Sequence, residues 1–231
     1  MPDNLLTVTH LTKRFGTPLG HLPPVIQDLS FAIPRGGRVT IFGPSGAGKT
    51  TLINILTRVD RTYEGAFALA AKNPCTIFQE PRLFPYMTVE ENIFLPAKIR
   101  KTPITPDLLA HYRRWLEVCD LTPRLAVSHY PYQLSGGMKQ KTALIRGFLI
   151  EPDFVMMDEP FKSIDMRAKR AIISHILESY PGVTVLFVTH AVDEILLLTE
   201  SVLLFKASRL AEYTVHDSAR LKANPMEVLY G

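Results

Sequence analysis

Short runs of β-branched and other apolar residues alternate along the chain with segments of helical periodicity. The apolar runs predict strands, mostly buried, over residues 5–10, 26–33, 39–42, 75–78, 154–157 and 183–188. Helical patterns occupy residues 51–57 and 166–179, and the tail from residue 201 predicts two further strands and a short helix. A loop rich in glycine and proline is expected over residues 16–24. This alternation of strands and helices is typical of the α/β class.

From about residue 89 to residue 148 the pattern is helical. A Pro-Asp helix start is followed by apolar side chains at helical spacing, namely Leu108, Leu109, Tyr112, Leu116 and Cys119. We therefore expect a helical insert over residues 84–151, with an α/β core over residues 1–83 and 152–231.

Composition narrows the class of protein. The 231 residues are 46% hydrophobic and 21% charged, which excludes a disordered chain and suits one large domain or two small ones. The formal net charge is only +4, and the basic residues are not gathered in one run, so we expect no nucleic acid as a partner.

Three features indicate a protein of the cytosol. The two cysteines, Cys75 and Cys119, cannot form a disulfide framework and are expected to be buried free thiols. The N-terminus has no basic region followed by an apolar run, so no signal peptide is expected. Nor does any segment offer the roughly 18 uninterrupted apolar residues that a membrane-spanning helix needs.

A glycine-rich motif between the third predicted strand and the following helix fits a phosphate-binding loop. It matches G-x-x-x-x-G-K-[ST] in full, and its residues are Gly43, Pro44, Ser45, Gly46, Ala47, Gly48, Lys49 and Thr50, followed by Thr51. Glycines let backbone N–H groups approach phosphate oxygens, and the next helix adds its positive end. Lys49 can reach the β- and γ-phosphates, and the Thr50 hydroxyl can bind Mg²⁺.

Two acids close the apolar strand over residues 154–157. Asp158 at this position can hold Mg²⁺ directly or through water, and Glu159 can orient or deprotonate an attacking water. An Asp-Glu pair alone is a weak signal, but it gains weight downstream of a complete phosphate loop. We expect the two elements to lie on adjacent parallel strands, as in a nucleotide hydrolase.

A third motif indicates the family. The run Leu134-Ser135-Gly136-Gly137-Met138-Lys139-Gln140 precedes a helical pattern and resembles the signature motif of ATP-binding-cassette (ABC) ATPases. Physically it is a second anion-binding turn at a helix N-terminus. Because one phosphate group does not need two such turns from one chain, we infer that the second serves a nucleotide held by another copy.

The resemblance implies roles for further residues. Gln79 matches the family's glutamine loop, Ser163-Ile164-Asp165 matches the loop that crosses to the partner subunit, and His190 matches the histidine that contacts the γ-phosphate. Phe15 stands where the family places an aromatic ring on adenine, although simple packing is the alternative interpretation. The implied ligands are ATP and Mg²⁺, with Thr50, Gln79 and Asp158 on the metal and Glu159, His190, Gln79 and Lys49 in catalysis.

The resemblance also implies a fold and an assembly. It covers residues 5–210 and predicts one ABC ATPase domain over residues 1–231: a P-loop NTPase core with an antiparallel β subdomain and an inserted α-helical subdomain that contains the signature motif. Two such chains are expected to form a homodimer around two ATP molecules; a heterodimer with a paralogous cassette is the alternative.

Within the family, the nitrate/sulfonate/taurine-type importer ATPases are the most similar. The similarity lies in Met138 of the signature, in residues 78–86 and in residues 188–194. It implies an importer subunit, peripheral on the cytoplasmic side of the plasma membrane, with transmembrane permease subunits and a separate solute-binding protein as partners. The alternatives are a cytosolic ABC-type ATPase not coupled to transport, or an exporter subunit, which Met138 disfavours. Nitrate, sulfonate, taurine or a vitamin precursor would suit this chain equally well as the solute.

Some positions depart from the family's pattern. Lys141 stands where arginine is usual and keeps the charge without the fork geometry. Gly147 replaces alanine in the signature helix, at a cost of about 1 kcal/mol in helix propensity. The apolar segment 83–88 either packs within the insert or forms part of a groove for a helix of the membrane subunit. We expect a mixture, with some of these side chains exposed.

Overall fold

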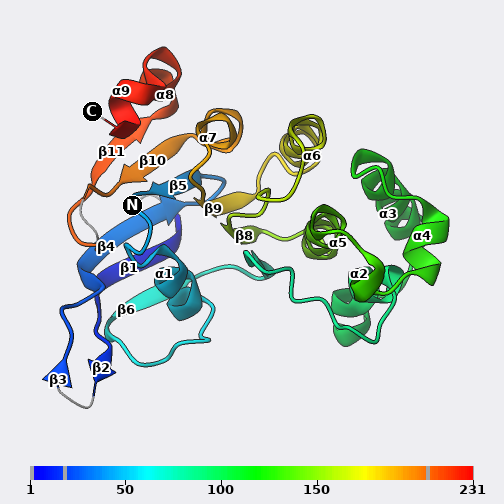
Figure 1. Ribbon diagram of the computed structural model, residues 1–231, viewed down its shortest axis with the longest axis horizontal. Helices are drawn as coiled ribbons and strands as arrows, with labels where there is room; N and C mark the ends of the chain where they lie inside the picture. The colour runs from blue at the N-terminus through cyan, green and yellow to red at the C-terminus, as the bar shows by residue number, and fades with distance from the viewer. Residues whose placement is uncertain (1–2, 18–19, 207–208, 231) are drawn as a thin grey trace. The chain divides into compact units, whose positions relative to one another are not determined.

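The computed structural model describes residues 3–17, 20–206 and 209–230 of the chain. The chain forms two compact units, which are described separately: Met1–Lys72 with Gly182–Gly231, and Asn73–Pro181. Figure 1 labels the elements of both units in chain order.

The first unit contains a three-stranded antiparallel sheet in the order β4-β1-β6. Strands β1 (Asn4–Lys13) and β4 (Ile26–Pro34) extend the predicted runs by a few residues, and along β4 buried and exposed positions alternate. Sequence analysis missed β6 (Glu64–Leu69), because its side chains are exposed or half-buried and provide no apolar run. The loop expected over residues 16–24 contains a short two-stranded ladder of β2 (Gly16–Thr17) and β3 (Gly20–His21).

A second group of strands in this unit runs in the order β11-β10-β5-β9. Strand β5 (Arg38–Phe42) is parallel to both of its neighbours, β9 (Thr184–Val188) and β10 (Ser201–Leu204), while β11 (Thr214–Asp217) is antiparallel to β10. Because both edges of β5 are occupied, the acidic strand cannot pair with it. The expectation of adjacent strands was wrong, since crossover connections rather than sequence order set strand neighbours.

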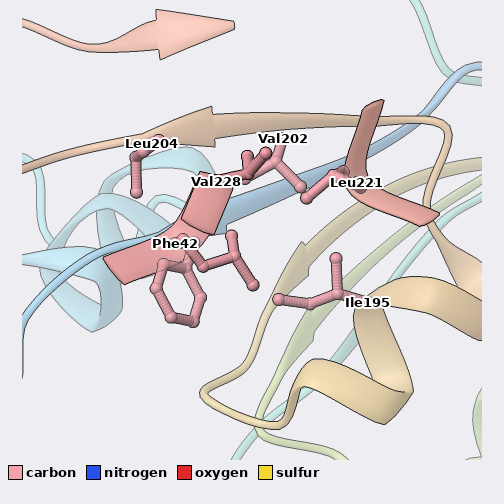
Figure 2. Packing of buried hydrophobic residues seen from close by; sticks show 7 residues of the cluster. Phe42, Ile195, Val202, Leu204, Leu221 and Val228 are labelled. Atoms are coloured by element: carbon pink, nitrogen blue, oxygen red, sulfur yellow. The ribbon is translucent and has the colours of Figure 1, made fainter. Parts of the chain in front are cut away.

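Four helices complete the first unit: α1 (Lys49–Leu56), α7 (Val192–Leu198), α8 (Ser218–Ala223) and α9 (Pro225–Tyr230). The tail therefore ends in two short helices rather than the single one predicted. Figure 2 shows how they pack: Leu221 of α8 and Val228 of α9 meet Phe42 at the end of β5 and Ile195 of α7 in one buried cluster. This cluster anchors the C-terminal helices against Phe42, at the end of the strand that leads into the glycine-rich loop.

The second unit combines two parallel strands with helices. Strands β7 (Pro74–Ile77) and β8 (Phe154–Asp158) pair with Cys75 opposite Val155. The helices are α2 (Val89–Ile99), α3 (Pro106–Val118), α4 (Pro123–Ser128), a 3-10 turn (Pro131–Gln133), α5 (Gly136–Phe148) and α6 (Met166–Ser179). Among the described residues the longest helix is α6 with 14 residues, and none is both long and apolar enough to span a bilayer.

Side-chain caps explain where the helices of the second unit begin. Threonine precedes α2, α3 and α4, and each hydroxyl accepts a hydrogen bond from a backbone N–H in the first turn. Thr88 and Glu91 form a complete capping box at α2, and proline occupies the first position of α3 and α4. These caps are local signals that can be read in the sequence.

Both cysteines are free thiols, as predicted. Cys119 is buried and Cys75 is half-buried. Burial raises the pKa of Cys119 to about 12 and that of Cys75 to about 11. Both thiols are therefore protonated at neutral pH and unreactive as nucleophiles.

An aromatic cluster joins α3, α5 and α6 in the second unit. The Tyr180 hydroxyl accepts from Trp115 Nε1 at 2.9 Å and donates to the Phe148 carbonyl at 2.9 Å. Its single hydrogen is thereby used, so His111, whose Nε2 lies 2.7 Å away, must be the donor in their contact. His175 packs edge-on against Trp115 with ring centroids 4.5 Å apart. His175 is buried and His111 half-buried, and both rings contact this cluster.

We expect the stability of this cluster to depend on pH. Burial lowers the pKa of His111, and burial together with Arg114 and His111 lowers that of His175. As the pH falls, the histidines of the unfolded chain therefore bind protons before those of the folded chain. The stabilisation from neutral His111 and His175 is complete above the ordinary histidine pKa, and it is lost as the pH falls from that pKa towards the lower pKa of the folded state. Urea unfolding at pH 7.5 and 5.5 should show a smaller free energy of unfolding at pH 5.5. A His111→Gln/His175→Gln variant should show a smaller difference between the two pH values, and an unchanged difference would contradict this assignment.

Candidate phosphate site and signature helix

The glycine-rich loop starts where β5 ends at Phe42 and finishes where α1 begins at Lys49. Two of its glycines have positive φ angles, +78° at Gly46 and +100° at Gly48. A Cβ atom on Gly48 would lie 2.5 Å from Val25 Cγ1 and 3.2 Å from the Val25 carbonyl oxygen. Only glycine satisfies both conditions at position 48, so backbone conformation and close packing together shape this loop.

Lys49 spans the inside of the loop. Its side chain is buried, and its Nζ donates to the carbonyl oxygens of Gly43 at 2.8 Å and Pro44 at 2.7 Å. The Lys49 ammonium therefore lies next to the first residues of the loop, which ends at the start of α1. No side chain caps α1, and no acidic residue occupies its first turn, where Thr50 and Thr51 lie. The helix start is thus electropositive and suited to an anion.

His190 lies in the same unit, directly after β9. Its side chain is exposed, and its ring meets that of Phe42 edge-on with centroids 6.2 Å apart. Two hydrogen bonds hold the preceding residue, Thr189. Its hydroxyl donates to the buried Glu194 carboxylate at 2.5 Å and accepts from the Ala191 N–H. The loop that carries His190 is therefore held at its base while the imidazole remains accessible.

The acidic strand end lies in the second unit. Asp158, the last residue of β8, is only 2% exposed. Glu159 follows with a positive φ of 44°, a left-handed conformation that costs a non-glycine residue about 1–2 kcal/mol. Such strain concentrates at functional sites, where the surrounding structure imposes it.

The strained backbone directs the Glu159 carboxylate towards two donors. Gln79 Nε2 lies 3.3 Å and Lys162 Nζ 3.4 Å from Glu159 Oε2. Gln79 itself is exposed and follows β7. The structure thus brings Gln79, Asp158 and Glu159 together in the second unit, whereas the glycine-rich loop and His190 belong to the first.

The Ser-Gly-Gly motif forms the start of α5, as the sequence predicts. The Ser135 hydroxyl caps the helix by accepting from the Met138 N–H at 3.3 Å, and Ser135 and Gly136 are exposed. A Cβ on Gly137 would lie 2.5 Å from the Ser163 carbonyl oxygen, so a side chain there is excluded. Met138 is half-buried. The first turn of α5 has no acidic residue, so this exposed helix start is again suited to an anion.

Asp165 belongs to the next loop and caps α6. Its carboxylate accepts from the Ala168 N–H at 2.9 Å, and this hydrogen bond lowers the pKa of the Asp165 carboxyl. The side chain is exposed and charged at neutral pH. Together with Ser163, which touches Gly137, it joins the start of α6 to the start of α5.

The segment from Gln79 to Thr88 is held at both ends. On one side Gln140 of α5 donates to the Phe78 carbonyl at 3.4 Å, and Arg146 of α5 donates to the carbonyls of Pro81 at 2.8 Å and Arg82 at 3.0 Å. This segment is therefore attached to the helix that begins with the signature turn.

On the other side, the fully buried Asn92 of α2 acts as a clamp. Its amide nitrogen lies 3.0–3.1 Å from the carbonyl oxygens of Phe84, Met87 and Thr88, which share its two hydrogens, and its oxygen accepts from the Phe84 N–H at 2.8 Å. Phe84 and Tyr86 remain 51% and 92% exposed, whereas Leu83 and Met87 are half-buried. The expected mixture of exposed and packed side chains is confirmed.

Phe15 follows β1 in the first unit and is 42% exposed. Its ring lies over the Lys13 ammonium, with 4.9 Å between Nζ and the ring centroid. Sequence reasoning did not find this lysine, nor did it find Asn92. Neither belongs to a recognised motif. Asp60, the ion-pair partner of Lys13, lies 47 residues away, whereas the partners of Asn92 lie only four to eight residues before it.

The glycine that interrupts the signature helix has a packing reason. A Cβ on Gly147 would lie 2.8 Å from Cys75 Sγ and 3.3 Å from Ile77 Cγ1. The helix can approach β7 this closely because it has no side chain at this position. The cost in helix propensity is therefore offset by a close helix–strand contact.

We expect Gly147→Ala to destabilise the chain by about 1 kcal/mol, because overpacking of about 1–3 kcal/mol exceeds the gain in propensity of about 1 kcal/mol. Removing the sulfur in Cys75→Ala/Gly147→Ala should make room for the new methyl group. The free energies of unfolding of the single and double variants, from urea denaturation, should then show a favourable interaction of at least about 1 kcal/mol. Additive effects would contradict this account.

Comparisons of sequence give a consistent result. The family described as ABC transporter matches residues 26–162. Aliphatic sulfonates import ATP-binding protein SsuB of Bacillus anthracis is 30% identical over 211 residues, which cover 87% of this chain and 81% of the relative. Taurine import ATP-binding protein TauB of Pelagibacter ubique is 34% identical over 202 residues, which cover 83% of this chain and 74% of the relative.

A comparison of structures supports the fold. The ATP-binding cassette MJ0796, solved as a dimer in a post-hydrolysis state bound to ADP and Pi, matches with a TM-score of 0.80 and 24% sequence identity. The match covers 92% of this chain and 98% of that one. The expected fold class is therefore confirmed, including its antiparallel β part and its helical part.

Proposed function

Because this chain belongs to the ABC transporter family, we propose that it is the ATP-hydrolysing subunit of a bacterial importer of a small solute. One observation carries the proposal: the chain holds two glycine-bearing helix starts suited to phosphate, at α1 and at α5. The names of the relatives, import ATP-binding proteins for aliphatic sulfonates and taurine, support import of a sulfonate-type solute. A second cassette of the same chain is the expected dimer partner.

In this dimer two ATP molecules lie between two copies. Each site combines the glycine-rich loop, Gln79, Asp158, Glu159 and His190 of one copy with residues 135–138 of the other. The chain then acts as one ABC ATPase domain, with residues 84–151 as the helical subdomain and the remainder as the core. Asp165 lies beside the signature turn and faces the partner copy, and Phe15 supports the adenine.

Glu159, Lys49 and His190 have different roles in ATP hydrolysis. Glu159, half-buried and aligned by Gln79, takes a proton from the attacking water. Lys49 moves its ammonium from the loop carbonyls to the β- and γ-phosphates, and His190 donates to the γ-phosphate. The N–H groups at the start of α1 stabilise charge that develops on the transferring phosphoryl group.

The residues present fit Mg²⁺. Thr50, Gln79 and Asp158 offer a hydroxyl, an amide and a carboxylate, which are the oxygen ligands that this ion prefers. Few protein ligands are needed, since Mg²⁺ in nucleotide sites also uses phosphate oxygens and water. When bound, the ion neutralises phosphate charge and so assists the displacement.

The contacts of α5 provide a route from the nucleotide to the membrane. Closure of the dimer on ATP engages the signature turn at the start of α5. Gln140 and Arg146 of the same helix hold the segment after Gln79, so movement of α5 moves that segment. The exposed Phe84 and Tyr86, presented by Asn92, dock against a helix of the permease subunit.

In this assembly the chain is peripheral to the cytoplasmic face of the inner membrane, where it is bound through permease subunits. A separate solute-binding protein delivers the solute from the other side. Hydrolysis reopens the dimer and resets the permease.

The test is a pull-down from native membranes. Tagged Glu159→Gln chain with Mg-ATP, expected to be trapped as the closed dimer, serves as bait, and the same bait without nucleotide is the matched control. Mass spectrometry should identify a multi-spanning membrane protein in the nucleotide sample. Recovery of only soluble or nucleic-acid-associated proteins, from membranes shown to be intact, would overturn the proposal in favour of a cytosolic ATPase.

A further inference from the structure

A buried lysine lies beneath the exposed ring of Phe15. The Lys13 side chain, in the last residue of β1, is only 4% exposed. Its Nζ contacts the Asp60 carboxylate at 2.7 Å, the Thr62 carbonyl oxygen at 2.6 Å and the Thr62 hydroxyl at 2.7 Å. An ammonium has three hydrogens to donate, so these three acceptor groups use all of its hydrogen-bonding capacity.

The acceptors are themselves held in place. The Asp60 carboxylate accepts from the Thr62 N–H at 3.0 Å and from the Thr62 hydroxyl at 2.9 Å. Burial alone would raise the pKa of Asp60, but the hydrogen bonds from Lys13 and Thr62 lower it. The Asp60 carboxylate is therefore ionised at neutral pH, and together with Thr62 it holds Lys13 Nζ in one position.

The ring of Phe15 rests on this fixed charge. Its centroid is 4.9 Å from Lys13 Nζ, within the range of a cation–π contact. The backbone on either side is also tied, since Val25 N–H donates to the Lys13 carbonyl at 2.9 Å and Leu22 N–H to the Phe15 carbonyl at 3.1 Å. With 42% of Phe15 exposed, the ring is positioned at the surface rather than packed in the core.

We propose that Lys13, held by Asp60 and Thr62, positions the Phe15 ring as a stacking platform for the nucleobase. This inference rests on the proposed function, which supplies the nucleotide. Lys13 touches neither the phosphates nor the base, and it acts only through Phe15. Because stacking uses the π-face that every base offers, the platform strengthens binding of ATP and GTP alike and contributes nothing to binding of a triphosphate without a base.

The test compares dissociation constants for Mg-ATP, Mg-GTP and Mg-tripolyphosphate, measured by calorimetry on the full chain. Phe15→Ala should weaken binding of both nucleotides on the order of tenfold and leave tripolyphosphate binding unchanged. Lys13→Met should weaken nucleotide binding several-fold, again without effect on tripolyphosphate. The exposed Lys222→Met in α8 is the matched control and should change none of the three constants.

Two further variants distinguish positioning from a general structural role. The double variant Phe15→Ala/Lys13→Met should bind nucleotides no more weakly than Phe15→Ala, because Lys13 acts only through the ring. Asp60→Asn keeps the shape of the clamp and should reproduce the Lys13→Met pattern even if Lys13→Met does not fold.

The inference is overturned if Asp60→Asn leaves nucleotide binding unchanged, if tripolyphosphate binding weakens equally, or if the two substitutions are additive. Failure of the native chain to bind Mg-ATP is a different result, and it would overturn the proposed function together with the inference.

Discussion

Glu159→Gln should lower the steady-state rate of ATP hydrolysis by at least about 100-fold while the chain still binds Mg-ATP. Glutamine keeps the shape of the side chain and its contact with Gln79, but it cannot accept the proton of an attacking water. A positioned general base contributes about 10²–10⁴-fold to a reaction of this kind. The side chain is placed for this role by the positive φ of 44° at Glu159 and by donors 3.3 Å and 3.4 Å from one of its oxygens.

The measurement is phosphate release at saturating Mg-ATP, with gel filtration to detect a dimer trapped by unhydrolysed ATP. Glu151→Gln provides a matched control, because Glu151 lies in the same unit and also has a positive φ, of 50°, but is exposed. It should hydrolyse ATP at the native rate. Full turnover in Glu159→Gln would show that the base lies elsewhere.

Gly48→Ala should weaken Mg-ATP binding by at least about tenfold. The new methyl group would lie 2.5 Å from Val25 Cγ1 and 3.2 Å from the Val25 carbonyl oxygen, in a residue whose φ is +100°. The left-handed conformation alone costs a non-glycine residue about 1–2 kcal/mol, and relief of the clash requires the loop to move. Either change misdirects the N–H groups that precede α1.

Calorimetric titration with Mg-ATP measures this effect, and Gly46→Ala is the matched control. Gly46 also has a positive φ, of +78°, but a methyl group there would meet no atom within 4 Å. Its effect on affinity should therefore be the smaller one. Val25→Ala should restore part of the affinity in the Gly48→Ala background, because it removes the nearest clashing atom. Equal effects at both glycines, with no recovery, would mean that packing against Val25 is unimportant.

Local sequence patterns predicted most of the elements because the forces that form them are local. Helix α6 begins and ends at the predicted residues, since Asp165 caps it and its apolar side chains follow the helical period. Strands β8 and β9 are buried at every position and appear as uninterrupted apolar runs. Strand β6 lacks such a run, and its pairing with β1 depends on a partner more than fifty residues away.

The candidate site divides in the same way. The glycine-rich loop, the Asp158-Glu159 pair and the Ser-Gly-Gly turn are contiguous, so the chemistry of each can be inferred from its own residues. Part of the support of the Gln79 segment is not contiguous, since Gln140 and Arg146 reach it from α5, more than sixty residues away. From the sequence, Gly147 only lowers the propensity of the helix. The structure explains the glycine, because a Cβ atom at this position would lie 2.8 Å from Cys75 Sγ.

By itself the sequence determined the α/β class, the helical insert, the family resemblance and the residue types available for phosphate and metal. Tertiary structure alone decided that β9 and β10, not the acidic strand, flank β5, and that Lys13 and Asp60, 47 residues apart, form an ion pair under Phe15. The physical reason is the range of the interactions. Caps, turns and amphipathic periods involve residues a few positions apart, whereas strand order and buried ion pairs form between segments that meet only when the chain is folded.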